Sequence, residues 1–373
     1  MELIATCAFG LEKIVHDELK KLGLWVIKKE DGRVIFEGDD LALIRANLWL
    51  RCGDRVQIKI GEFKALTFDE LFDQVNALPW EKYIRKNDAF PVDAVSVKSA
   101  LHSEPAIQSI VKKSIVKRLQ LKHITEILSE NSGTTYQIMV KSNKDQFTVS
   151  IDSSGDSLHK RGYRMKAKEA PMKETLAAAL IQLSDWTPSR TLIDPFCGSG
   201  TIGIETALIA SNMAPGIKRT FAFQRWSWID QEHMKKAYQE AREVFKSNTE
   251  LKIYNFDIDA EALEIAQKNA NNAGFKNLNF KHSDFSDLDF SRFENATFIC
   301  NPPYGERLED VPHVEKMYRE FGKKFAETKN CSLFFITPSE NFPHFFGRPA
   351  DKNRKLFNGG IRCYLFSYFA NRN

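Results

Sequence analysis

The sequence lacks the features of a membrane protein and of a zinc protein. No stretch of it approaches the roughly eighteen uncharged apolar residues that a membrane span needs. Its six cysteines are scattered, without a CxxC pair or a Cys/His cluster that could hold zinc. The N-terminus has neither the basic region nor the apolar core of a signal peptide. We therefore expect a cytoplasmic protein with free thiols and no metal.

The chain also lacks a strong excess of charge and any internal repeat. Its 53 basic and 49 acidic residues give a net charge of +4, which is a weak sign of nucleic-acid binding for a chain of this length. Its 43% of hydrophobic residues is ordinary for a globular protein. With 373 residues the chain exceeds one typical core, so we expect two or three domains.

The N-terminal part of the chain has the pattern of two small α+β modules. Strand-like runs at 3–7, 24–28 and 33–37 accompany an amphipathic helix that ends at Gly23, which predicts a compact module over residues 1–60. Further strand-like runs alternate with two helices over residues 61–155. This stretch predicts a second module.

The second helix of that module is rich in positive charge. Between residues 98 and 123 the one acid is Glu104, and the basic residues are Lys98, Lys112, Lys113, Lys117, Arg118 and Lys122. Apolar residues recur at helical spacing, and Lys113 and Lys117 lie one turn apart on another face. Two interpretations stay open, a solvated helix face and a surface that binds phosphates.

The rest of the chain predicts a larger α/β domain. Residues 152–168 are basic and poor in apolar residues, which is typical of a linker. From a helix at 175–183 onward, strands alternate with helices in the manner of a parallel, doubly wound sheet. Two last strand-like runs, 331–337 and 360–369, predict an antiparallel edge. We expect this domain to cover residues 165–373.

A glycine-rich turn follows the first strand of this domain. Gly198, Gly200 and Gly203 fit the G-x-G-x-x-G pattern of dinucleotide-binding proteins. That pattern alone is weak, because no acid follows between Glu205 and Asp230 to bind a ribose. Asp194, at the end of the strand, would repel a pyrophosphate but would pair with an amine. S-adenosylmethionine, which carries an amine and no phosphate, therefore fits better than a nicotinamide or flavin cofactor.

Two more acids follow the next two strands. Asp257 could accept hydrogen bonds from ribose hydroxyls, and Asp284 could accept one from the adenine amine. The alternative for each is a helix N-cap, and we expect Asp259 to be one. A carboxylate after each of three successive strands favours a ligand site over three separate caps.

The run Asn301-Pro302-Pro303-Tyr304 follows the apolar stretch 296–300, where a buried strand ends. Two prolines in succession fix φ and donate no N–H, so the Asn301 side chain and the Pro302 carbonyl can hold two acceptors in one place. Both could accept protons of an exocyclic amine while Tyr304 stacks on the base. Taken alone, the run is also compatible with an ordinary tight turn.

Segments 194–201 and 301–304 together resemble the class I methyltransferases that use S-adenosylmethionine and act on amino groups. Segments 161–178 and 357–361 resemble the THUMP-domain RNA methyltransferases, in particular bacterial relatives of the 23S rRNA guanine-N2 methyltransferase. The resemblance implies a ferredoxin-like module over 1–60 and a THUMP domain over 61–155. It also implies a Rossmann-like methyltransferase domain over 165–373 with a mostly parallel seven-stranded sheet.

The resemblance implies roles for individual residues. The cofactor, S-adenosylmethionine, would be held by Asp194, Phe196, Gly198, Gly200, Thr201, Asp257, Ile258, Asp284, Phe285, Pro171, Thr175 and Leu176. The target base would be held by Asn301, Pro302, Pro303 and Tyr304. RNA would be bound by Lys98, Lys112, Lys113, Lys117, Arg118, Arg161 and Arg164. The implied partner is 23S rRNA or a ribosome assembly intermediate, without an obligate protein partner.

Several alternatives stay open. The same tetrapeptide occurs in adenine-N6 DNA methyltransferases, and tRNA guanine N2 is a further possible target. A binding protein that has lost catalysis is disfavoured, because every expected ligand group is present. The THUMP-like half favours RNA, so we expect guanine N2 of 23S rRNA as the target. Residues 211–250 form an insertion whose aromatic side chains either stack on RNA or pack against the sheet: Phe221, Phe223, Trp226 and Trp228.

Overall fold

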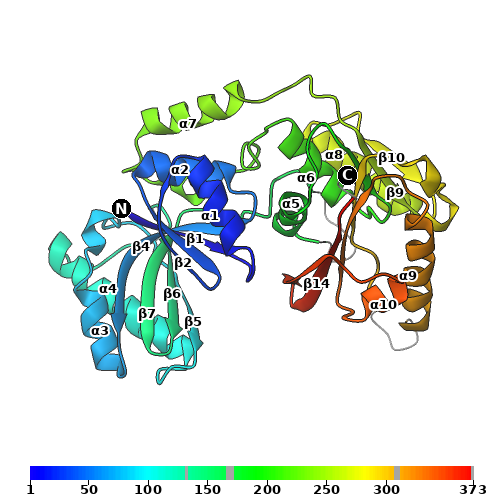
Figure 1. The fold of residues 1–373 in the computed structure, drawn as a ribbon. Helices are drawn as coiled ribbons and strands as arrows, with labels where there is room; N and C mark the ends of the chain where they lie inside the picture. The colour runs from blue at the N-terminus through cyan, green and yellow to red at the C-terminus, as the bar shows by residue number, and fades with distance from the viewer. Residues whose placement is uncertain (131–132, 165–171, 306–310, 371–373) are drawn as a thin grey trace. The chain divides into compact units, whose positions relative to one another are not determined.

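The chain folds into two compact units (Figure 1). The computed structural model describes residues 1–130, 133–164, 172–305 and 311–370. The first unit comprises Met1–Cys7, His16–Leu158 and Thr220–Gln239, and the second comprises Ala8–Val15, His159–Arg219 and the chain from Glu240 onward. Within the described ranges, no helix has both the length and the apolar character needed to cross a membrane.

The first unit is built on one seven-stranded sheet with the order β2-β3-β1-β4-β7-β6-β5. Its strands are β1 (Glu2–Cys7), β2 (Trp25–Glu30), β3 (Arg33–Glu37), β4 (Gly53–Lys64), β5 (Val92–Val97), β6 (Gln137–Asn143) and β7 (Gln146–Asp152). The long strand β4 pairs with β1 through its first half and with β7 through its second half. The two N-terminal modules therefore share a continuous sheet.

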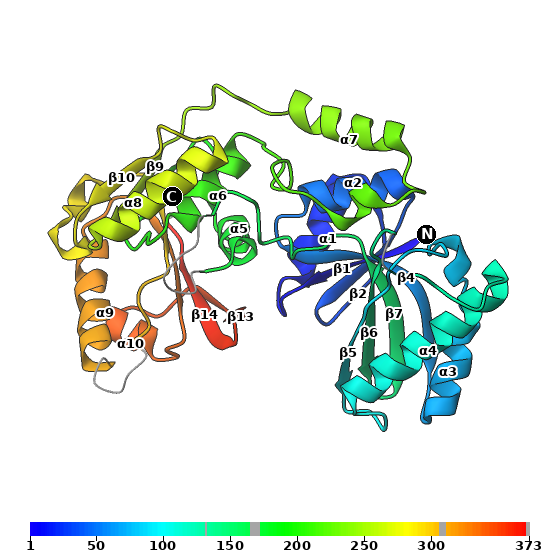
Figure 2. The ribbon, with the colours of Figure 1, turned by 180° about the vertical axis from the view of Figure 1, so that it is seen from behind.

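The helices of these two modules are α1 (Glu12–Lys21), α2 (Asp40–Trp49), α3 (Phe68–Asn76) and α4 (Glu104–His123), with a 3₁₀ turn at Trp80–Lys82. Side chains cap two of them, since Asp39 accepts from the N–H of Ala42 and Thr67 forms a capping box with Glu70. Helix α4 contacts α3 (Figure 2) and buries the apolar stripe expected from its spacing: Ile107, Val111, Ile115 and Leu119.

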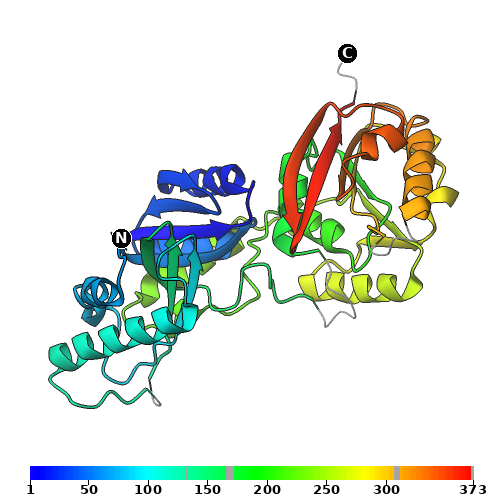
Figure 3. The same ribbon diagram turned by 90° about the horizontal axis from the view of Figure 1, so that it is seen from below.

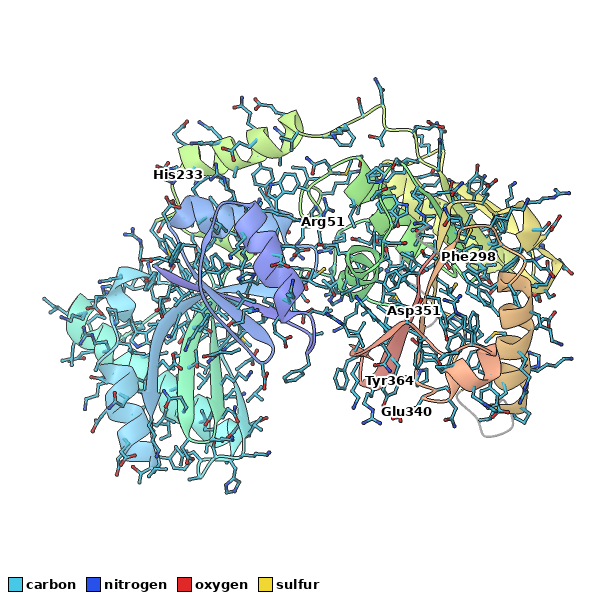
Figure 4. All side chains as sticks on the ribbon, viewed as in Figure 1. Arg51, His233, Phe298, Glu340, Asp351 and Tyr364 are labelled. Carbon is cyan, nitrogen blue, oxygen red and sulfur yellow. The ribbon has the colours of Figure 1, made fainter. Side chains whose placement is uncertain are left out.

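Residues 220–239, the middle of the insertion, pack within the first unit. They contain a 3₁₀ turn at Ala222–Arg225 and most of α7 (Gln231–Glu243). The Trp226 ring stacks on Tyr136 with centroids 5.1 Å apart, and His233 lies 2.6 Å from the Asp40 carboxylate (Figure 4). Phe221, Phe223 and Trp226 are buried. These aromatic side chains are therefore packed against protein, and the alternative of stacking on RNA does not apply to them.

The second unit is built on a seven-stranded sheet with the order β10-β9-β8-β11-β12-β14-β13. Its strands are β8 (Thr191–Asp194), β9 (Ile253–Asp257), β10 (Asn279–His282), β11 (Ala296–Cys300), β12 (Ser332–Thr337), β13 (Lys352–Asn358) and β14 (Ile361–Tyr368). The first five strands in this order pair in parallel, whereas β14 is antiparallel to both its neighbours. The mostly parallel sheet and its antiparallel edge are thus confirmed.

Helices cover this second sheet in two groups (Figure 3). Helix α6 (Thr201–Ala210) contacts α5 (Glu174–Leu183) and α8 (Ala260–Ala273), while α9 (Val311–Phe325) contacts α10 (Phe342–Phe346). The core is rich in aromatic rings, and Phe298 in the middle of β11 is fully buried (Figure 4). Because β11 is covered on both faces, all five of its residues are buried, and its polar neighbours begin only at Asn301.

Candidate functional site

A cavity of about 760 Å³ opens in the second unit at the carboxyl ends of β8, β9 and β11. Open α/β sheets bind their ligands at this edge. Among the predicted site residues, the cavity is lined by Asp194, Phe196, Gly198, Thr201, Asp257, Ile258, Asp284, Phe285, Asn301, Pro302 and Pro303. Eleven residues that the sequence spreads over more than a hundred positions therefore surround one space.

The glycine turn between β8 and α6 shapes the floor of this cavity. Gly198 has a φ of 51°, and its N–H donates to Asp257 Oδ2 over 2.7 Å. Gly200, with a φ of 80°, does not line the cavity. A Cβ at this position would lie 2.9 Å from Phe280 and 3.0 Å from Ala266. Gly198 thus belongs to the ligand side of the turn, and Gly200 lets the turn approach β10 and α8.

Asp194 is a fully buried carboxyl group with one oxygen unpaired. Its Oδ1 accepts the N–H of Phe196 over 3.1 Å, whereas its Oδ2 has no hydrogen-bond partner among the described residues. Burial raises the pKa of Asp194 to about 8, and the charge of Asp257 adds to the rise. A buried acceptor without a partner is costly unless a ligand supplies the donor, so the site fits a cationic amine.

Two further carboxylates line the same cavity. Asp257 accepts two backbone hydrogen bonds, from Gly198 and from Asp259, and so is held rigidly at the end of β9. Asp284 Oδ1 caps the 3₁₀ turn Phe285–Asp287 by accepting the N–H of Ser286 over 2.8 Å. Asp259 caps α8, which confirms that prediction. Asp284 is therefore a cap as well as a wall of the cavity, and the two interpretations given for it do not exclude each other.

Asn301, Pro302 and Pro303 line the cavity next to the glycine turn, but Tyr304 is not one of the described residues that do so. The Tyr304 hydroxyl donates to Asn301 Oδ1 over 2.7 Å and accepts a hydrogen bond from Asn358 Nδ2 over 3.1 Å. Burial raises the pKa of Tyr304, so the hydroxyl keeps its proton at neutral pH. The tetrapeptide is therefore linked to the hairpin β13–β14, a contact that the sequence did not reveal.

Other predicted cofactor residues lie elsewhere, and other cavity residues were missed. Thr175 and Leu176 are buried in α5 and do not line the cavity, and Pro171 lies outside the described residues. Met172 lines it instead. Helix α9 contributes four residues that the sequence analysis did not single out, His313, Lys316, Met317 and Glu320. Their i, i+3, i+4, i+7 spacing just after the tetrapeptide was the available signal.

Two of the predicted RNA-binding residues are placed inside the second unit. Arg161 is 3% exposed, and its Nε lies 3.4 Å from Oε1 of the fully buried Glu205. Arg164 donates to Glu174 over 2.9 Å and, over 3.0 Å each, to the Thr201 hydroxyl and the Met172 carbonyl. The expected basic linker is thus a packed segment up to residue 164. Each guanidinium is engaged by internal partners, and the contact of Arg161 and Arg164 with RNA stays a prediction.

The predicted RNA-binding residues of the first unit, Lys98 and those of α4, fall into two sets. Lys112 pairs with Glu130 and lies over the Phe90 ring, and Arg118 pairs with Glu81. Lys98, Lys113 and Lys117 are exposed, and no acidic side chain in the described parts of the chain forms an ion pair with them. The second set is therefore available to an anionic partner.

A mostly parallel sheet whose glycine turn, buried carboxylates and Asn-Pro-Pro run share one cavity defines the class of the protein, a class I methyltransferase. Three family models match the chain. They describe an RMKL-like methyltransferase domain over residues 161–366, an RlmL ferredoxin-like domain over 2–57 and a THUMP domain over 65–152. The chain therefore belongs to the family of THUMP-containing, RMKL-like methyltransferases that use S-adenosylmethionine.

Curated relatives agree with this family. YpsC from Bacillus subtilis, which is named provisionally as an RNA methyltransferase, is 46% identical over 99% of this chain and 96% of its own length. The ribosomal RNA large subunit methyltransferase K/L of Psychromonas ingrahamii is 34% identical over 97% of this chain. The chain spans about half the length of that relative, 49%.

Solved structures share the whole fold. SMU.472, which is named provisionally as a methyltransferase and is complexed with SAH, is 44% identical with a TM-score of 0.94, and the match covers 100% of this chain and 98% of that one. A Listeria monocytogenes protein, described as a predicted N6-adenine-specific DNA methylase, is also 44% identical, with a TM-score of 0.93 over 99% of this chain and 96% of its own. These names agree on methyl transfer and differ on the substrate.

Proposed function

We propose that the protein transfers a methyl group from S-adenosylmethionine to guanine N2 in 23S rRNA, in the cytoplasm. The observation that carries the methyl transfer is the cavity shared by the unpaired Asp194 carboxyl oxygen and the Asn301-Pro302-Pro303 run. The choice of RNA is supported by the THUMP match and by the exposed lysines Lys113 and Lys117 on α4. The choice of large-subunit rRNA is supported by the name of the K/L relative.

The cavity residues fit the groups of this cofactor. Asp194 would pair with the ammonium through its unpaired oxygen, and the turn at Gly198 would hold the methionine part. Asp257 would accept from the ribose hydroxyls, and Asp284 would accept from the adenine amine, with Ile258 and Phe285 against the ring. When bound, the sulfonium supplies an electrophilic methyl carbon.

The target amine would be activated by acceptors and not by a strong base. Asn301 Oδ1 and the Pro302 carbonyl would each accept a hydrogen bond from one N–H of the amine. These two bonds would turn the nitrogen toward tetrahedral geometry and direct its lone pair into the cavity. The N–C bond forms as the C–S bond breaks, and one proton then leaves the cationic product amine to water. Two fixed acceptors suffice, because the methylated amine is acidic while it is cationic.

The test is to identify the methylated nucleoside. The enzyme and labelled cofactor are incubated with total RNA, and separately with DNA, from a strain that lacks the protein. We expect label in 23S rRNA as N2-methylguanine, and Asn301→Ala should lower the turnover about a hundredfold, as for one lost transition-state donor or acceptor. Label in tRNA and not in 23S rRNA would refute the choice of 23S rRNA and identify tRNA as the substrate.

The second candidate function is methylation of adenine N6 in DNA. The observation in its favour is the description of the Listeria relative, since the tetrapeptide chemistry serves either exocyclic amine. Recovery of N6-methyladenine from the DNA arm, with unlabelled RNA, would establish this candidate and refute the main one. An intact or partly assembled large subunit, offered beside naked rRNA, would show which form is methylated.

A further inference from the structure

The Tyr304 hydroxyl joins two segments that are 54 residues apart in the sequence. The hydroxyl donates a hydrogen bond to Asn301 Oδ1, and its oxygen accepts one from the Nδ2–H of Asn358. Asn358 is the last residue of β13 and pairs with Ile361, the first residue of β14. A polar link of three side chains therefore runs from the hairpin β13–β14 to the residue that faces the cavity.

The direction of this link is set by its donors. An amide N–H can only donate, so Asn358 takes the acceptor side of the hydroxyl and leaves the hydroxyl proton for Asn301. The buried Cys363 Sγ lies 3.7 Å from the same hydroxyl oxygen and also acts as a donor there. Because burial raises the pKa of Tyr304, this proton remains in place at neutral pH. Successive hydrogen bonds of one direction strengthen one another.

The link matters for Asn301 because an amide has two unlike ends. A carbonyl oxygen has two lone pairs, so Oδ1 can accept the hydrogen bond from Tyr304 and a second one from a target amine. A rotated amide would present its NH₂ group, which cannot accept an amine proton. The Tyr304 hydroxyl therefore selects the productive orientation of Asn301.

We propose that Asn358 is a positioning residue of the target-amine site: through the Tyr304 hydroxyl it holds the Asn301 amide with its oxygen available to the amine. The proposal rests on the proposed methylation of an exocyclic amine, and it holds for guanine and for adenine. It gives the Phe357–Ile361 segment, which resembles the family in sequence, a function at the site.

A purely local role of Asn358 in shaping the hairpin is the rival explanation. The backbone itself argues against it, because the turn is made by Gly359, with a φ of 62°, and Gly360. A Cβ on either glycine would meet nothing within 4 Å. The turn therefore needs a glycine at position 359, and among the described residues the Asn358 side chain donates to the Tyr304 hydroxyl and not to the backbone of the turn.

The kinetic test uses Asn358→Asp, which keeps the shape of the side chain but removes its N–H donors. Its carboxylate would also compete for the Tyr304 proton, so kcat should fall about fivefold, the size of one ordinary hydrogen bond, while KM for S-adenosylmethionine stays unchanged. Asn358→Ala should lose about as much. Asn353→Ala, at an exposed asparagine of the same strand, is the matched control and should keep the wild-type kcat.

A double-mutant cycle separates positioning from structure. If Asn358 acts through the hydroxyl, Asn358→Ala should cost nothing further in a Tyr304→Phe background. Losses that multiply in the double variant, or wild-type turnover in Asn358→Asp, would overturn the proposal.

A measurement without turnover completes the test. In protein labelled with ¹³Cζ-tyrosine, the Tyr304 signal is assigned by its loss in Tyr304→Phe, and it should move in Asn358→Ala but not in Asn353→Ala. An unmoved signal overturns the link itself. A wild-type enzyme that methylates no RNA would refute the proposed function instead, so the two failures are distinguishable.

Discussion

Two groups of basic residues look alike in the sequence and differ in the structure. Arg161 and Arg164 lie in a stretch with few apolar residues, and Lys113 and Lys117 lie on a helix with many basic neighbours. In the second unit both arginines are engaged by buried or half-buried partners, whereas in the first unit both lysines are exposed. A cluster of cations is thus no evidence of a binding surface until its acidic partners are known.

The difference follows from the chemistry of the two side chains. A guanidinium presents several donors in a fixed fork and can bridge a carboxylate, a hydroxyl and a carbonyl together, as Arg164 does. A lysine ammonium is strongly hydrated, so it stays in water unless an acid lies beside it. The two arginines therefore make contacts within the second unit, whereas the two lysines remain exposed to solvent.

The largest expected effect that separates the two groups is on stability. Arg161→Met leaves the buried Glu205 without its cation, and the free energy of unfolding of the second unit should fall by about 3–5 kcal/mol. Lys113→Met, the exposed control in the first unit, should change the free energy of unfolding of its own unit by less than about 0.5 kcal/mol. Urea denaturation measures both. Adding Glu205→Met should recover most of the loss, and equal losses in the single and double variants would contradict an ion pair.

The second effect concerns Asp194, whose buried Oδ2 has no partner in the described part of the chain. With its pKa at about 8, Asp194 is mostly neutral at pH 6.5 in the ligand-free protein, while the cofactor amine is protonated below about 8. Pairing requires the carboxylate, so binding at pH 6.5 should release about one proton. Asp194→Asn should abolish this release and weaken binding by about 1.5–3 kcal/mol.

Calorimetry in two buffers of different ionisation enthalpy measures the proton release from Asp194. The exposed variant Asp289→Asn should release the proton as the wild type does. Since the pKa of Asp194 is raised on folding, this group also lowers the stability of the ligand-free protein as the pH rises from about 4 to about 8. Proton release that persists in Asp194→Asn would assign it to another group.

The third effect tests whether Arg164 acts on the cofactor or on RNA. Arg164→Ala removes the donors to Thr201 and Met172, both of which line the cavity, so the affinity for S-adenosylmethionine should fall about fivefold. RNA affinity should stay unchanged. Arg164→Lys should not rescue cofactor binding, because an ammonium cannot replace the fork. Weaker RNA binding with unchanged cofactor affinity would return Arg164 to the role that the family resemblance implied.

The smallest effect is expected on the helix surface. Replacing Lys113 and Lys117 with Ala should weaken RNA binding and lower the slope of log affinity against log salt by about 1 for each lost phosphate contact. Filter binding at several salt concentrations measures it. The double variant Lys112→Ala, Arg118→Ala should change the slope less, because both cations already pair with acids. Equal slopes in all three proteins would leave α4 as a solvated face.

Much of the fold follows from local patterns. Strand 33–37 is observed at Arg33–Glu37, and the apolar stripe of α4 is buried as its spacing predicts. Asp194, Asp257 and Asp284 line one cavity because the carboxyl ends of parallel strands meet at one edge of a sheet. These features depend on a few neighbouring residues each, so a single sequence contains them.

Contacts between distant segments were not predictable in this way. The Tyr304 hydroxyl accepts a hydrogen bond from Asn358, and four residues of α9 line the cavity. Trp226 of the insertion stacks on Tyr136 in the first unit. The residues next to Trp226 and Tyr304 in the sequence do not indicate these partners, because each pairing depends on how whole elements pack.

The sequence by itself determined the order of strands and helices, the glycine turn and the chemistry of three acids and one tetrapeptide. Periodicity and strand ends depend on neighbouring residues, so they can be recognised without knowing which segments pack against them. Only the tertiary structure decided which cations are exposed, which acid lacks a donor and how Asn301 is oriented. The reason is that the state of a charged or polar group depends on burial and on its partner, and both come from residues far away in the chain.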